Sequence, residues 1–101
     1  MKLIEIEPHF WELYQDQQQL YLSVSVDNSA VTYNWDLHLT QEQADRYQQQ
    51  GRDSVVELAK QVVAGVFRGD FSFIEQHETT AEKKAEILAA FRVWRETQAQ
   101  H

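Results

Sequence analysis

Cysteine is absent from this chain of 101 residues, and only three glycines and one proline occur. The lack of cysteine argues against disulfides, thiolate metal sites and cysteine nucleophiles, and it fits a reducing compartment. The glycines are not clustered, which argues against a glycine-rich phosphate loop. The apolar runs fall short of the about 20 residues of a membrane span, and residues 1–8 lack a basic-then-apolar leader. We therefore expect one soluble, cytoplasmic domain over residues 1–101.

Positive charge is scarce in the first half of the chain. Residues 1–45 hold eight acidic side chains and one basic one, Lys2, whereas residues 46–101 hold eight of each, and the net charge is −7. A negative field repels phosphate backbones and anionic lipids, so we expect no binding to nucleic acid or membranes. It attracts a basic protein and speeds the encounter, although an acidic surface also serves to keep a protein in solution.

Apolar and polar residues alternate through the first forty positions, which is the period of β-strands. Residues 20–26 and 31–39 each place every second side chain on one apolar face. A tight turn at Asn28-Ser29 would set Val26 opposite Val31, so that apolar residues meet apolar residues along the whole hairpin.

The preceding segment follows the same pattern. A turn at Asp16-Gln17 would set Leu13 opposite Leu20 on the apolar face, and residues 3–6 read as a further short strand. The sequence therefore predicts an antiparallel meander of three or four strands over residues 3–39.

The rest of the chain contains residues that typically begin and end helices. Thr40 and Gln43 form a capping box that opens a mostly polar helix over about 41–50, and Gly51 ends it. Asp53 is expected to cap a second helix, over about 54–68, whose wide apolar band makes it the central helix against the sheet.

A capping box at residues 79–82 opens a third helix over about 80–97. Its expected buried stripe consists of Ile87, Leu88, Phe91 and Trp94. Residues 71–76 fit a short strand or an extra helical turn equally well. Because an antiparallel sheet with one apolar face must cover that face, we predict an α+β fold of two layers, with the meander covered on one face by these three helices.

The opposite face of the sheet would then be polar and bear tyrosines. Rings supply contact area and carboxylates supply steering, so this face suits the docking of a basic protein. The candidate partner-binding residues are Glu12, Tyr14, Tyr21, Asp27, Asn34 and Asp36. Two alternatives remain: the tyrosines only pack across strands, or the face is a homodimer interface.

Signals for catalysis or metal binding are sparse. Asp36 and His38 project from one strand face two residues apart, which suits two metal ligands, but no third ligand is apparent. Glu12 and Asp36 share a face as a glycosidase carboxylate pair would, yet a strand separates them and nothing indicates a cleft. We therefore expect no catalytic residue, no metal site and no cofactor.

A series of residues from Leu20 to about Val66 points to a family. The hairpin is followed by Leu39-Thr40-Gln41-Glu42, then Tyr47 and Gly51, then Ser54-Val55-Val56-Glu57-Leu58-Ala59. This half of the chain resembles the small acidic immunity proteins of bacterial polymorphic toxin systems, especially those of contact-dependent growth inhibition.

The resemblance implies a cytosolic antitoxin that binds one cognate toxin domain, often a basic nuclease, and occludes its active site. It carries over no fixed binding residues. The alternatives are a general interaction module or homodimeric subunit without catalysis, and a small metal-dependent enzyme that uses Asp36 and His38. The sequence leaves monomer and homodimer equally open.

Overall fold

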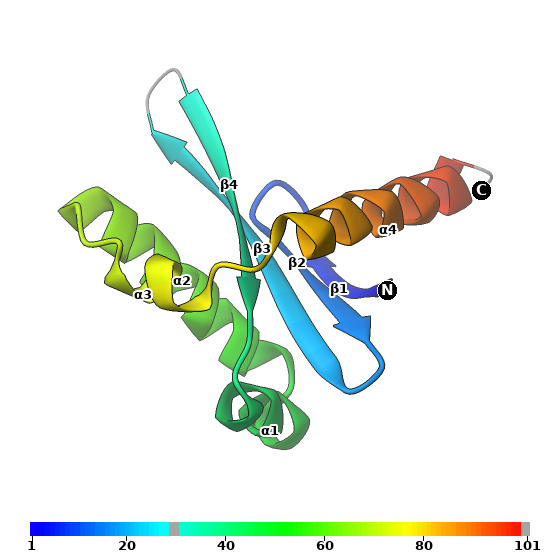
Figure 1. Ribbon diagram of the computed structural model, residues 1–101, viewed down its shortest axis with the longest axis horizontal. Coiled ribbons are helices and arrows are strands. Elements are labelled where there is room, and N and C mark those ends of the chain that lie inside the picture. The colour runs from blue at the N-terminus through cyan, green and yellow to red at the C-terminus, as the bar shows by residue number, and fades with distance from the viewer. Residues whose placement is uncertain (29–30, 100–101) are drawn as a thin grey trace.

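The computed structural model describes residues 1–28 and 31–99, and it has the predicted α+β class. Four strands come first, followed by four helices (Figure 1). The strands are β1 (Lys2–Glu7), β2 (Trp11–Asp16), β3 (Gln19–Asn28) and β4 (Val31–His38). The helices are α1 (Gln41–Gln50), α2 (Arg52–Arg68), α3 (Ser72–His77) and α4 (Ala81–Ala99).

The sheet is an antiparallel meander in the order β1-β2-β3-β4, as the alternation predicts. The predicted pairing register is wrong by two residues in the last hairpin. Val26 lies opposite Tyr33, not Val31, and Asn28 belongs to β3. Of the predicted turn Asn28-Ser29, Ser29 lies outside the described residues.

The same two-residue shift occurs between β2 and β3. Leu13 lies opposite Leu22, not Leu20, and Asp16 pairs with Gln19, so the turn is formed by residues 17 and 18. Gln17 takes the positive φ of 59° that this turn requires. A shift of two residues leaves every side chain on its own face, so the predicted faces survive the wrong registers.

The boundaries of α1 follow its predicted caps, whereas the start of α2 does not. The Thr40 hydroxyl accepts from the Gln43 amide at 3.1 Å and Gln43 Oε1 accepts from the Thr40 amide at 2.8 Å, which confirms the capping box. Gly51, at φ 70°, ends α1. The predicted Asp53 cap is wrong: α2 begins at Arg52 directly after Gly51, with no side-chain cap. Residues 72–77 form the short helix α3.

The main core lies between one face of the sheet and helices α1, α2 and α3. The sheet contributes the alternate positions of β2, β3 and β4, including the fully buried Trp11, Leu13 and Leu22. Helix α2 contributes Val55 and Val62, which are also fully buried. Its apolar band thus covers this face, as the sequence predicts.

Helix α4 packs on the opposite face, and this overturns the prediction that all helices cover one face. Ile87 and Ala90 of α4 form a second buried cluster with Leu3, Tyr14 and Tyr21 of the sheet. In Figure 1, α4 crosses β1 and β2 well apart from the group of α1, α2 and α3. The sheet is therefore the middle of three layers.

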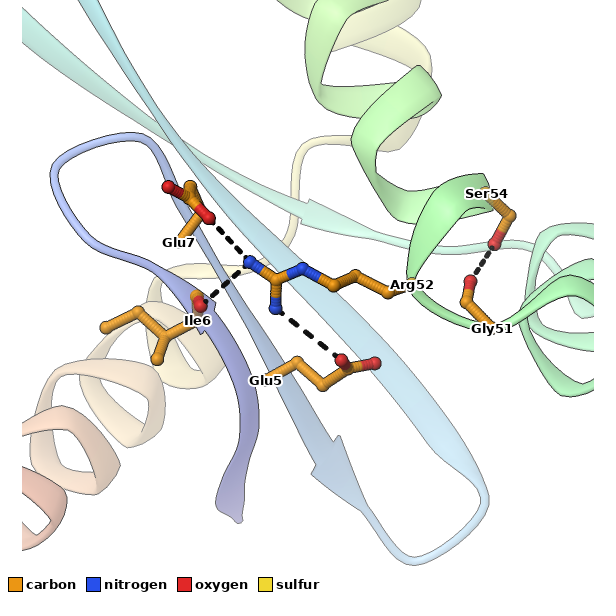
Figure 2. Close-up of polar contacts among 6 residues, drawn as sticks. All are labelled: Glu5, Ile6, Glu7, Gly51, Arg52 and Ser54. Carbon is orange, nitrogen blue, oxygen red and sulfur yellow. Dashed lines mark hydrogen bonds and ion pairs between the residues drawn. The ribbon is translucent and has the colours of Figure 1, made fainter.

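On each face a basic side chain of a helix forms ion pairs with the sheet. Figure 2 shows Arg52, the first residue of α2, donating to Glu7 at 2.6 Å and to the Ile6 carbonyl at 3.1 Å, with Glu5 at 3.6 Å. The Arg52 guanidinium also lies 4.7 Å from the centroid of a Trp11 ring. On the other face Lys83 of α4 bonds Asp16 at 2.9 Å.

Candidate protein-binding groove

A groove runs between helix α4 and the polar face of the sheet. All four strands contribute to it, and its volume is about 540 Å³. We call it the α4 groove. Its floor comes from the polar positions of β2, β3 and β4, and one wall comes from α4. The groove exists because α4 covers only part of this sheet face: Ile87 is buried at the contact, whereas Leu88 beside it is 51% exposed.

Two carboxylates and a hydroxyl form a row across the floor. Glu12 on β2 pairs with Ser23 on β3, and Ser23 pairs with Asp36 on β4. Because neighbouring strands lie about 4.8 Å apart, the two acidic residues sit two strand spacings from each other. All three side chains line the α4 groove.

Glu12 is held in an environment that disfavours its charge. Burial raises the pKa of this carboxyl, the hydroxyl of Tyr14 lowers it by donating a hydrogen bond over 3.3 Å, and the charge of Asp36 raises it further. Burial and the nearby Glu12 carboxylate likewise raise the pKa of Tyr14 above its ordinary range. The floor is therefore an electronegative site that a cation would stabilise.

Three other acidic residues of the sheet, Glu5, Glu7 and Asp16, are compensated by cations. Arg52 forms ion pairs with Glu5 and Glu7, and Lys83 forms one with Asp16. The hydrogen bond from Lys83 lowers the pKa of Asp16. Within residues 1–28 and 31–99, no lysine or arginine forms an ion pair with Glu12 or Asp36.

The one lysine or arginine that lines the groove, among the residues described, is Lys84, and its ammonium donates a hydrogen bond to Glu78 at 2.9 Å. The floor carboxylates thus keep their charge available to an incoming group.

The α4 wall of the groove is apolar and aromatic. Phe91 and Trp94 lie one turn apart with ring centroids 5.8 Å from each other, and both are half-buried. Leu88 precedes them along the same side of the groove. Rings beside a desolvated carboxylate can hold the flat face and the alkyl stem of an arginine or lysine side chain while its charge reaches the acid.

The predicted partner-binding residues divide into two groups. Glu12, Tyr14, Asn34 and Asp36 line the α4 groove, and Asn34 accepts from the Ser25 hydroxyl at 2.7 Å. Asp27 lies apart near the end of β3, where it accepts a hydrogen bond from Thr32.

Tyr21 lies outside the groove. Its ring stacks on His38, with ring centroids 4.8 Å apart, and the residue is 4% exposed.

The expectation of an open, ring-bearing face is corrected by the burial of both tyrosines. Tyr14 is fully buried and Tyr21 nearly so, because α4 packs over them. Both rings are apolar enough to form a core, and the Tyr14 hydroxyl still finds Glu12 as its partner, so burial leaves no polar group unpaired there. Neither ring can present its face to another protein.

The candidate metal pair does not converge. Asp36 lines the α4 groove, whereas His38 bonds Gln19 at 2.6 Å and lines a separate hollow beside α3. Across the described part of the chain, no group of three or more histidine, aspartate or glutamate side chains is placed to hold a metal ion. None of the helices described there is both long and apolar enough to cross a membrane.

Sequence reasoning missed the contribution of α4 and the cleft it creates. Phe91 and Trp94 were expected on the apolar side of the sheet, together with Leu88, which is exposed instead. A signal was present in β1, where Leu3 and Ile4 are consecutive and face opposite clusters. Apolar residues on both faces of a strand indicate that both faces are covered.

Comparison of the chain with protein-family models, with curated proteins and with solved structures finds no match.

Proposed function

We propose that this chain is an immunity protein, which binds a basic toxin domain and neutralises it by occluding its active site. The α4 groove is the proposed contact surface. The observation that carries the proposal is the pair of carboxylates Glu12 and Asp36. Both line the groove beside aromatic side chains, burial disfavours the charge of Glu12, and among the described residues no lysine or arginine forms an ion pair with either. The resemblance of residues 20–66 to immunity proteins supplies the toxin as the partner.

The groove suits one lysine or arginine side chain of the toxin. Its ammonium or guanidinium would sit between Glu12 and Asp36, and its stem would lie along Phe91 and Trp94. A hydrogen bond to a charged group contributes about 1.5–3 kcal/mol to binding, and a cation here also offsets the burial and the repulsion from Asp36 that together raise the pKa of Glu12. The surrounding negative charge of residues 1–45 would speed the encounter.

We expect a gene for a basic toxin domain beside the gene for this chain, and the test measures binding to that domain. The double variant Glu12→Gln, Asp36→Asn keeps the size of both side chains and removes two charges. We expect affinity to fall by about 100-fold, because loss of two charged contacts costs roughly 3 kcal/mol. Protection of cells that express the toxin should be lost in parallel.

The matched control is Glu42→Gln, Asp45→Asn on α1. It removes the same net charge from exposed positions outside the groove. We expect it to slow association modestly, as a loss of long-range steering would, and to leave the dissociation rate unchanged. Equal loss of affinity in both double variants would contradict the groove as the contact surface. Absence of any complex with that domain would contradict the toxin partner.

A further inference from the structure

The outer edge of β4 is open over residues 31–35. β4 ends the sheet, and on its outer side the carbonyl of Asp36 accepts from the amide of Thr79 at 3.0 Å. Alternate residues of a strand direct their backbone groups to the same side, so Asn34 and Thr32 also direct N–H and C=O outward. In the described part of the chain, no backbone group pairs with these two residues on that side. We call residues 31–35 the β4 edge.

The opposite edge of the sheet is protected. β1 carries the charged residues Lys2, Glu5 and Glu7, and Arg52 donates a hydrogen bond to the carbonyl of Ile6. Such charges are a common means of preventing strand addition. The β4 edge has none of these protections: its sequence, Val-Thr-Tyr-Asn-Trp, contains no charge and no proline.

An apolar patch lies along the same edge. Val31 and Tyr33 are 49% and 47% exposed, and the Tyr33 ring stacks on half-buried Trp35 at 6.3 Å. The Trp35 ring in turn packs against Phe71, with ring centroids 5.9 Å apart, and Phe71 is 37% exposed. Exposed apolar groups beside unpaired backbone groups mark a surface that associates with another strand.

The distribution of charge indicates that the β4 edge pairs with a second copy of this chain. A basic partner gains nothing from an uncharged edge, whereas the α4 groove offers it two carboxylates. Two copies of a chain with net charge −7 repel each other least where charge is sparse; residues 31–35 carry none, and the neighbouring carboxylate of Asp27 is engaged by the Thr32 hydroxyl. An antiparallel pairing of one strand with itself is also self-complementary, which a twofold dimer requires.

We propose that the β4 edges of two copies pair antiparallel about Tyr33, which joins the two sheets into one. In this register Tyr33 faces Tyr33 of the second copy, Thr32 faces Asn34, and Val31 faces Trp35. The pairing stops at Asp36, where Thr79 already occupies the outer side of β4. Because β1 is protected, the assembly closes as a dimer and does not grow into a fibre.

The first test measures molecular mass by light scattering over a dilution series. We expect the intact protein to shift between one and two 11.9 kDa chains. Thr32→Pro removes an outward amide without removing a bond to β3, and Tyr33→Lys places two ammonium groups face to face. Both variants should remain monomeric at the concentrations where the intact protein is dimeric. The control Val93→Lys adds the same charge at an exposed site on α4 and should dimerise normally.

The second test reads the register directly. The chain has no cysteine, so a single introduced cysteine can form only intermolecular disulfides. Facing residues at a non-hydrogen-bonded position lie about 4.5 Å apart at Cα, within the range of a disulfide. Under mild oxidation the Tyr33→Cys variant should cross-link rapidly, and the Val31→Cys and Val93→Cys variants slowly.

Three results would overturn the proposal: an intact protein that is monomeric at every concentration, a dimer that survives both edge substitutions, or equal cross-linking at all three cysteine positions. Circular dichroism spectra of the edge variants establish that they fold. These substitutions leave the residues that line the α4 groove intact, so toxin binding and dimerisation can fail independently of each other.

Discussion

The two faces of the sheet are covered to very different extents. The face toward α2 buries most of the core, from Trp11 and Leu13 through Leu22, and three helices close over it. The face toward α4 has a small cluster around Tyr14 and Ile87, with the α4 groove beside it. The first face holds the fold together, and the incomplete cover of the second leaves room for the groove where we propose that a partner binds.

The sharpest way to break this comparison is to truncate a side chain in the main core. Leu22→Ala should lower the free energy of unfolding by about 2–5 kcal/mol, because Leu22 is fully buried and the cavity cannot collapse easily. Denaturant unfolding monitored by fluorescence measures the change. Leu88→Ala, at a position 51% exposed, is the control and should change stability by no more than about 0.5 kcal/mol. Equal effects would mean that Leu22 is not in the core.

A smaller effect is expected from truncation on the α4 face. Ile87→Ala should cost about 2 kcal/mol, the lower end for such a change, because the cluster around it is small. Native-state hydrogen exchange should show the amides of α4 opening more readily, with those of α2 unchanged. If α2 and α4 responded alike, the two faces would form one cooperative unit.

The contacts of Arg52 on the main face are expected to contribute less to stability than either buried side chain. Arg52→Gln removes the contacts with Glu7 and Ile6 and the stacking on Trp11, shown in part in Figure 2. The Arg52 side chain is 40% exposed, so solvent screens it, and we expect a loss of about 1 kcal/mol that shrinks with added salt. Arg68→Gln is the control, since its contact with Asp70 spans 3.9 Å at an exposed site. A salt-independent loss would assign the effect to packing alone.

The smallest expected effect is a gain in stability. Because the pKa of Glu12 is raised in the folded protein, its charged form lowers stability above that pKa, and the penalty disappears as the pH falls toward the ordinary value of 4.5. Glu12→Gln should therefore stabilise the protein near neutral pH and be neutral below about pH 4.5. The glutamine oxygen can still accept from Tyr14. Thermal unfolding across this pH range measures the difference, and a pH-independent effect would contradict the role of charge.

The alternation in the sequence predicts which strand residues share a face, but it cannot fix the register. Val26 matches Val31 and Tyr33 equally well, because any shift by two residues pairs apolar with apolar. Turn chemistry decides between such registers. Gln17 with positive φ is an uncommon choice, so the turn at residues 17–18 gives little signal.

The site was only partly predictable for a different reason. Glu12, Asn34 and Asp36 were expected on one polar face, and they do share a groove. That Tyr14 lies under α4 depends on where a distant helix packs. The apolar stripe of α4 fits either face of the sheet, and a tyrosine can be buried as readily as exposed.

The order of the strands has a consequence for how the protein is made. Each strand pairs only with its neighbour along the chain, so successive hairpins can form without first closing a long loop. Helix α4 follows all four strands and the other three helices in the sequence, yet it packs on β1, so it can dock only after the sheet has been synthesised. A nascent chain therefore cannot form the α4 groove until α4 has left the ribosome, so the strands that make its floor wait for a wall that is synthesised long after them.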